Sequence, residues 1–111
     1  MTPNEYQRLA MRTCSIPYSQ KEDMIRHAVF GLTAETGEVS SIFQKEYQGH
    51  TVDAEHVKKE LGDCLWMIAE LCTTLDFNLE DVMQTNIDKL KKRYPDGFNP
   101  EKSLHRKTGD I

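Results

Sequence analysis

The chain has 111 residues, of which 38% are hydrophobic and 29% are charged, and its formal net charge is -4 at pH 7. This length suits one domain, and the chain has neither a signal-peptide pattern nor the ~20 apolar residues of a membrane-spanning helix, so we expect a cytoplasmic protein that does not bind membranes. The acidic balance argues against a partner that is a nucleic-acid polymer, and three cysteines without a CxxC pair argue against a disulfide framework or a zinc site.

Capping signals and apolar periodicity predict an all-α fold. The predicted helices cover about residues 3–13, 20–47, 54–75 and 79–94. Their expected N-terminal capping residues are Thr2, Ser19, Asp53 and Asn78. The first two are followed three residues later by Glu5 and Glu22, which is the spacing of a capping box. We expect one domain over residues 1–98 and a loosely ordered tail over residues 99–111.

The second and third predicted helices each carry an apolar stripe with the spacing of a core-facing helix. In the second helix the stripe consists of Ile25, Val29, Leu32, Val39 and Phe43. In the third it consists of Val57, Leu61, Cys64, Ile68, Leu71 and Leu75. Only a short loop joins the two helices, so they should pack antiparallel.

Two short acidic motifs lie beside these stripes, and each has the pattern acid-x-Gly-acid. The four acids are Glu35 and Glu38 in the second helix and Glu60 and Asp63 in the third. Both pairs flank their stripe on the same side, so an antiparallel helix pair should bring the four carboxylates to one rim. Oxygen ligands without a nearby His or Cys favour Mg²⁺ or Mn²⁺. The mid-helix glycines Gly37 and Gly62 are expected to allow the close approach of another helix.

Basic residues gather toward the C-terminus, where seven of the 14 Lys and Arg residues lie at or beyond Lys89. They form either a solvated helix end and tail or a phosphate-facing patch. Two other residues also have alternative interpretations. His27 could line a base pocket or lie on a helix surface, and Trp66 could stack on a nucleobase or pack in the core or a subunit interface.

Three segments resemble the MazG-type nucleotide pyrophosphohydrolases. Leu32 to Val39 and then Glu60 to Asp63 resemble the family's EExxE and ExxD motifs, although the first Glu of EExxE is Ala34 here. Asn86 to Phe98 resembles the family's Asn-x-x-Lys-Leu…Arg-Tyr-Pro segment. The resemblance implies a four-helix bundle-like fold that is active as a homodimer or homotetramer.

By the same resemblance, the four acids would bind Mg²⁺, and three residues of the fourth helix would contact phosphate or support the metal site: Asn86, Lys89 and Arg93. The implied reaction is attack of a metal-activated water on the α-phosphorus of a nucleoside triphosphate, with Glu35 or Glu38 taking the proton. The products would be a monophosphate and pyrophosphate, as in nucleotide-pool housecleaning.

Two other classes of function remain open. A non-catalytic helical dimerisation module would explain the amphipathic helices but not the matched acids and glycines. A di-iron carboxylate bundle would need Glu-x-x-His repeats, which this chain lacks.

Overall fold

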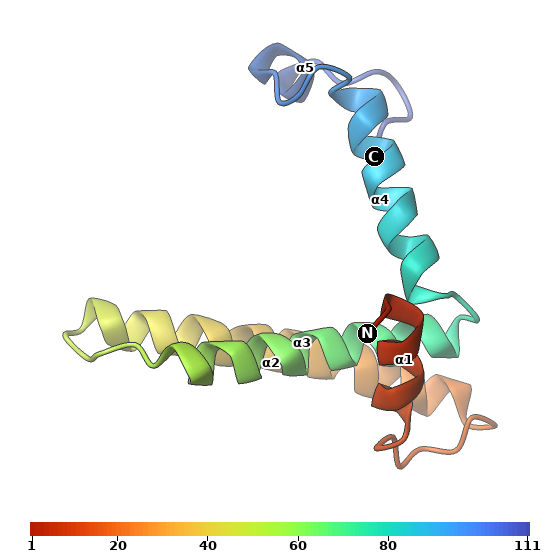
Figure 1. The fold of residues 1–111 in the computed structure, drawn as a ribbon, viewed down its shortest axis with the longest axis vertical. Helices are drawn as coiled ribbons and strands as arrows, with labels where there is room; N and C mark the ends of the chain where they lie inside the picture. Colours follow the sequence, from red (N-terminus) through yellow and green to blue (C-terminus); the bar gives the residue numbers. More distant parts are fainter. The chain divides into compact units, whose positions relative to one another are not determined.

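The computed structural model describes residues 1–111, and it is all helical, as predicted (Figure 1). The five helices are α1 (Pro3–Met11), α2 (Lys21–Tyr47), α3 (Ala54–Thr74), α4 (Leu79–Arg93) and α5 (Pro100–Leu104). The bounds of the first four agree with the predicted ranges to within two residues. None of the helices combines the length and the apolar character needed to span a membrane.

The chain forms two compact units, Met1–Leu79 and Glu80–Ile111. The first contains α1, α2 and α3, and the second contains α5 and nearly all of α4. The single domain over residues 1–98 stays a prediction. The segment expected to be a loose tail contains α5, which the sequence did not predict. The side chain of Asn99 caps this helix by accepting hydrogen bonds from the backbone N–H groups of Glu101 and Lys102.

In the first unit, α2 and α3 run side by side over most of their length (Figure 1). The chain reverses just after α2 at Gly49, whose φ of 100° lies in the left-handed region that glycine tolerates. The N–H of Gly49 donates to the carbonyl of Glu46, and the N–H of His50 donates to that of Lys45. These two bonds are the Schellman motif, which ends the helix and allows the antiparallel return.

Two of the predicted helix caps are confirmed, and one is wrong. Thr2 caps α1 through a complete capping box with Glu5, and the side chain of Asp53 accepts a hydrogen bond from the N–H of Glu55 at the start of α3. Ser19, however, does not cap α2, which has Gln20 at its N-cap and no side-chain cap. The N–H of Gln20 donates to the carbonyl of Pro17, and this turn places the helix start one residue later than predicted.

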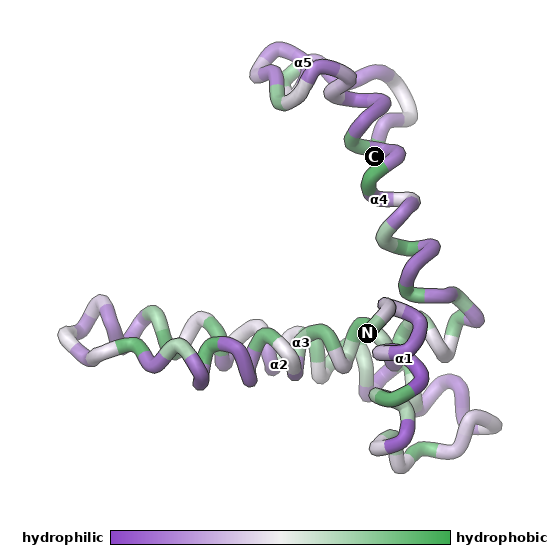
Figure 2. The backbone as a smooth tube through the Cα atoms, in the orientation of Figure 1, coloured by the Kyte–Doolittle hydropathy of each residue, from purple (hydrophilic) through white to green (hydrophobic).

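The face of α2 that is buried differs from the predicted apolar stripe. The buried apolar residues of α2 are Met24, Ala28 and Ile42, whereas Val29 of the predicted stripe is 42% exposed. On α3, Leu61 is 53% exposed. Figure 2 shows that hydrophobic positions of α2 and α3 alternate with polar ones along both helices. Each helix therefore carries apolar residues on two adjoining faces, and only one face is covered within the chain.

The glycines show where α2 and α3 pack closely. A Cβ atom at Gly31 of α2 would collide with the side chain of Met67, so Met67 of α3 packs against α2 at a position that has no side chain. By contrast, a Cβ at Gly37 or Gly62 would meet nothing within 4 Å. The helix approach predicted for these two glycines is therefore absent within one chain, and Gly31 fills that role instead.

Polar contacts attach α1 and the residues just after it to α3. The indole N–H of Trp66 donates to the carbonyl of Ala10 at 2.9 Å and to the hydroxyl of Thr13 at 3.0 Å. This agrees with the packing interpretation of Trp66 and leaves its N–H unavailable to a nucleobase. The carboxylate of Glu70, which is fully buried, lies 2.7 Å from Nδ1 of His27 and accepts a hydrogen bond from the thiol of Cys14. His27 thus links α2 to α3.

Candidate functional site

The antiparallel pairing of α2 and α3 gathers three of the four predicted carboxylates. Glu35 of α2 and Glu60 and Asp63 of α3 each offer an oxygen atom, and these atoms lie within 4.8 Å of one another. We call these three residues the carboxylate cluster. Glu35 and Glu60 are half-buried and Asp63 is exposed. Because residues three apart on a helix share a face, Glu60 and Asp63 both point to the side on which Glu35 lies.

Glu38 is the one predicted ligand outside this cluster. It lies one turn after Glu35 on α2 and is exposed to solvent. It is still close enough for its charge to contribute to the pKa of Glu35. The structure therefore brings three carboxylates together and leaves the fourth beside them.

The electrostatics of the cluster fit a cation site. Burial is the largest effect that raises the pKa of Glu35, and the charges of Asp63, Glu60 and Glu38 raise it further. Like charges held this close repel one another, and a bound cation would remove that repulsion. The donor set consists of carboxylate oxygens from two rigid helices, which suits a hard divalent ion such as Mg²⁺ or Mn²⁺.

Three neighbours of the cluster were not assigned to it from the sequence. The imidazole Nε2 of His56 lies 3.0 Å from Oε1 of Glu60, one turn away on α3, and so can orient that carboxylate. The hydroxyl of Tyr6 lies 3.5 Å from the carbonyl of Gly62, and burial followed by the charge of Asp63 raises the pKa of Tyr6. Burial, and then the charges of Glu35 and Asp63, raises the pKa of the Cys64 thiol.

These neighbours differ in how far the sequence could reveal them. His56 is four residues before Glu60 and shares its helix face, so the spacing offered a signal for this contact. Tyr6 is 56 residues from Gly62 along the chain, and no local pattern connects the two.

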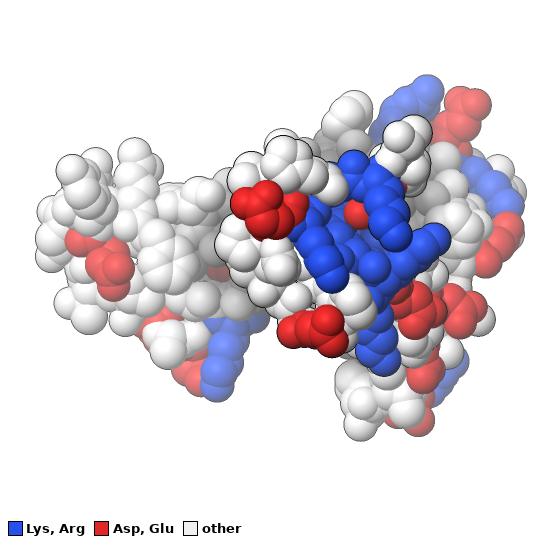
Figure 3. Space-filling model, turned by 90° about the horizontal axis from the view of Figure 1, so that it is seen from above, with Lys and Arg blue, Asp and Glu red and all other residues white.

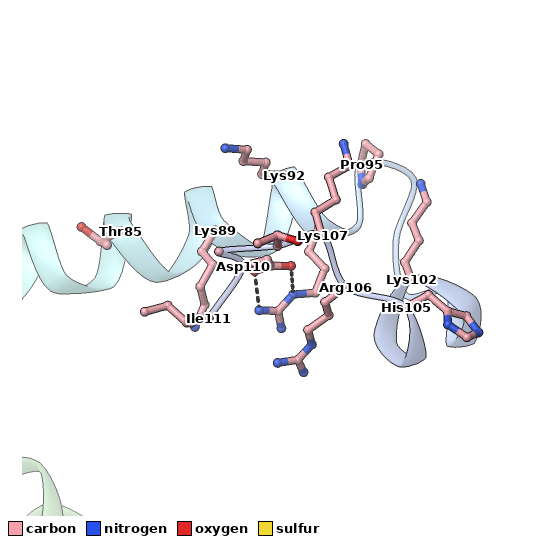
Figure 4. A pocket seen from close by; sticks show the side chains of 13 residues that line it. Thr85, Lys89, Lys92, Pro95, Lys102, His105, Arg106, Lys107, Asp110 and Ile111 are labelled. Atoms are coloured by element: carbon pink, nitrogen blue, oxygen red, sulfur yellow. Dashed lines mark hydrogen bonds and ion pairs between the residues drawn. The ribbon is translucent and has the colours of Figure 1, made fainter.

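The three predicted phosphate-contacting residues all belong to α4 in the second unit. Lys89 and Arg93 line a pocket in this unit, whereas Asn86 does not (Figure 4). Arg93 donates two hydrogen bonds to the carboxylate of Asp110, from Nε at 2.8 Å and from a terminal nitrogen at 2.7 Å. Its guanidinium is thus already paired within the unit, while Lys89 forms no ion pair.

Comparisons with known proteins identify the family of the chain. The model of the MazG nucleotide pyrophosphohydrolase domain matches residues 25–98, a range that includes all seven predicted site residues. The chain is also similar to the Gene 37 protein of Mycobacterium phage L5, with 30% identity over 96 residues that cover 79% of this chain and 84% of that protein. No solved structure matches the chain with significance. Because the family model spans more than half of its length, the chain belongs to the MazG nucleotide pyrophosphohydrolase family.

Proposed function

We propose that this protein hydrolyses nucleoside triphosphates, in their ribo or deoxy form, to the monophosphate and pyrophosphate. The observation that carries the proposal is the gathering of Glu35, Glu60 and Asp63 around one point on two packed helices. Family membership supports the reaction class. The physiological role that we propose is the removal of unwanted nucleotides from the cellular pool.

The cluster would hold Mg²⁺, with Mn²⁺ as a substitute. When bound, such an ion lowers the pKa of the attacking water and neutralises charge on the phosphate oxygens. His56 holds the carboxylate of Glu60 by a contact of 3.0 Å, and the helix pair fixes Glu35 opposite Asp63. These contacts position the three ligands before the substrate arrives, which limits the reorganisation required during the reaction.

We assign Glu38 as the general base that accepts the proton of the attacking water, with Glu35 as the alternative. Glu38 lies beside the cluster but outside it, so its carboxylate is free to accept a proton. In the proposed step, the water oxygen forms a bond to the α-phosphorus as the bond from that phosphorus to the bridging oxygen breaks. The proton of the water passes to Glu38, and pyrophosphate leaves with the electron pair of the broken bond.

The basic residues of α4 would hold the distal phosphates as the leaving unit. Lys89 has no ion-pair partner, and Asn86 is exposed and can donate a hydrogen bond to phosphate. Arg93 would have to exchange Asp110 for phosphate before it could contribute. The chain has no GxxxxGK[ST] loop, so the β/γ-phosphate cradle of P-loop enzymes is missing and attack at the γ-phosphorus is not favoured.

Analysis of the products tests the proposal. Purified protein with Mg²⁺ and a panel of nucleoside triphosphates should release monophosphate and pyrophosphate, which chromatography separates from diphosphate and orthophosphate. Diphosphate and orthophosphate as the first products would contradict attack at the α-phosphorus. If no triphosphate is cleaved while the protein self-associates, the alternative of a non-catalytic helical dimerisation module is correct.

Substitutions distinguish the residues that bind the metal ion from the residue that accepts the proton. Glu60→Gln and Asp63→Asn should abolish hydrolysis at low Mg²⁺ and recover part of it at high Mg²⁺, because they weaken ion binding. Glu38→Gln should lower the rate by about a hundredfold or more at every Mg²⁺ concentration, which is the usual contribution of a general base. Glu46→Gln, an exposed change near the end of the same helix, is the matched control and should leave the rate unaltered. Full recovery of Glu38→Gln by Mg²⁺ would make Glu38 a ligand instead.

A further inference from the structure

The second unit has a pocket that the carboxylate cluster does not explain. Its volume is about 610 Å³, and it lies between the C-terminal half of α4 and the chain from Lys102 to Ile111 (Figure 4). This last segment follows the part of the chain that the family model matches, which ends at residue 98. The pocket is therefore built largely from residues outside the shared family region.

The pocket is strongly basic although the whole chain is acidic. Six of its lining residues are cationic: Lys89, Lys92, Arg93, Lys102, Arg106 and Lys107. Asp110 is the only acidic residue among those that line it. Figure 3 shows a patch of adjoining Lys and Arg side chains on the face in view, with Asp and Glu side chains around its edge. This departs from the usual mixture of both signs on a protein surface.

Five of the six cations form no ion pair in the structure. Arg93 alone is paired, by two hydrogen bonds to Asp110, and its side chain is only 8% exposed. The charges of Arg93 and Asp110 therefore cancel, and this ion pair joins α4 to the C-terminal segment at the side of the pocket. The charges of the other five repel one another, and an anion in the pocket would relieve that repulsion.

Asp110 is the one anionic side chain at the edge of this pocket. Its hydrogen bonds from Arg93, followed by the charges of Arg93, Arg106 and Lys89, hold the pKa of Asp110 below its usual range. Burial acts in the opposite direction and is outweighed. A carboxylate from the C-terminal segment thus already occupies one edge of the basic surface, and the remaining cations have no such partner.

We propose that this pocket binds a chain of two or more linked phosphates, either as free polyphosphate or as the tail of a nucleotide. Five unpaired cations around one pocket exceed what a single phosphate needs, and they match a longer, more highly charged anion. An oligonucleotide fits less well, because no Phe, Tyr or Trp lines the pocket on which a base could stack.

This binding requires no metal, which separates it from the carboxylate cluster. It rests on the proposed function only in sharing Lys89 and Arg93, the residues assigned there to the leaving phosphates. The additional residues are Lys102, Arg106 and Lys107, to which nothing in the proposed hydrolysis assigns a role. A binding measurement without divalent ions therefore tests the pocket independently of catalysis.

Calorimetric titration of the full chain with tripolyphosphate tests the proposal. The buffer is freed of divalent ions on a chelating resin, because soluble chelators are themselves polyanions. We expect saturable binding that weakens as the salt concentration rises, with orthophosphate much weaker. Tighter binding of a nucleoside triphosphate than of tripolyphosphate would identify the tail of a nucleotide as the ligand, and weaker binding would identify free polyphosphate. Absence of saturable tripolyphosphate binding, or tighter binding of a single-stranded oligonucleotide, would overturn the proposal.

Variants locate the site. Lys102→Ala and Arg106→Ala should each weaken tripolyphosphate binding about tenfold, as expected for the loss of one charge-assisted hydrogen bond. Lys91→Ala is the matched control, because Lys91 lies on α4 but does not line the pocket, and it should bind as the wild type does. Asp110→Asn should tighten binding by freeing Arg93. Equal weakening by Lys91→Ala and Arg106→Ala would mean diffuse attraction to the unit rather than a pocket.

The same variants keep the two proposals apart. Glu60→Gln should lose hydrolysis at low Mg²⁺ but bind tripolyphosphate without metal as the wild type does. If metal-free binding is missing while hydrolysis is intact, only the pocket is wrong. If binding is present while no triphosphate is cleaved, only the proposed hydrolysis is wrong.

Discussion

Glu35 carries an electrostatic cost in the metal-free protein. Its partial burial and the neighbouring charges of Asp63, Glu60 and Glu38 raise its pKa in the folded state. The folded protein therefore binds this proton more tightly than the unfolded chain does. Well below its ordinary pKa of 4.5, Glu35 is protonated in both the folded and the unfolded state and does not lower the free energy of unfolding. As the pH rises above 4.5, the unfolded chain releases this proton more readily, so the free energy of unfolding decreases.

Removing the charge of Glu35 should stabilise the metal-free protein. We expect Glu35→Gln to raise Tm at pH 7 and the gain to vanish as the pH falls below about 4, where the wild-type carboxyl is protonated in both states. Adding Mg²⁺ should reverse the order, because the wild type then gains the free energy of ion binding. Scanning calorimetry over a series of pH values, with and without Mg²⁺, measures both effects.

Glu38→Gln provides the comparison for this prediction. Glu38 makes the smallest of the contributions that raise the pKa of Glu35 and lies outside the carboxylate cluster, so its removal should give a smaller rise in Tm. A Tm of metal-free Glu35→Gln below that of the wild type at pH 7 would show that Glu35 is stabilised by contacts rather than strained by its neighbours.

At the scale of the elements, Gln7 of α1 holds the chain where α3 ends and α4 begins. Its side-chain N–H group donates to the hydroxyl of Thr73 at 3.0 Å and to the carbonyl of Phe77 at 2.9 Å. Its side-chain oxygen accepts a hydrogen bond from the N–H of Leu79 at 2.8 Å. Gln7 and Leu79 are both buried, so the bond between them forms away from bulk water, while the other two bonds are partly buried.

Replacing Gln7 by a residue of similar length without its polar group should destabilise the first unit. Gln7→Met leaves the buried N–H of Leu79 without a partner, and we expect a loss of about 1–3 kcal/mol in the free energy of unfolding. Urea denaturation followed by circular dichroism measures it. Gln44→Met, an exposed change on α2, is the control and should have little effect. Equal stability of the two variants would mean that water replaces the lost bonds.

At the scale of the whole molecule, both units expose large apolar side chains. In the first unit Val29 and Phe30 of α2 and Leu61 of α3 are 42%, 69% and 53% exposed. In the second unit α4 exposes Ile87 and Leu90 in a similar way. A chain of this size buries little surface alone, and apolar patches of this kind mark protein interfaces. A second copy of the chain is the partner that we expect to cover them.

We therefore predict a homodimer or homotetramer in solution. Sedimentation at micromolar concentration should give at least twice the chain mass of 12.8 kDa. Val29→Asp should shift the distribution toward monomer by placing a charge in the interface, whereas Gln44→Glu, which adds the same charge at a polar exposed position of α2, should not. An active wild-type monomer would contradict the prediction.

Local signals in the sequence were sufficient to locate the first four helices and the acidic pairs. Caps such as Thr2 and Asp53 act over three residues or fewer, and apolar periodicity acts over one or two turns, so both can be read directly from the chain. The spacing of Glu60 and Asp63 likewise places both on one helix face. The short connection at Gly49 was enough to predict the antiparallel return of α3.

Only the tertiary structure decided which faces and partners these helices use. Both helices offer two adjoining apolar faces, and the packing of α2 against α3, with Met67 against Gly31, covers one of them. The packing of α2 against α3 brings Glu35 together with Glu60 and Asp63 and leaves Glu38 beside them. The contacts of Tyr6 with Gly62, of Gln7 with Leu79 at the start of α4, and of Arg93 with Asp110 join residues 17 to 72 positions apart. Such pairs depend on how the elements pack, which local patterns do not encode.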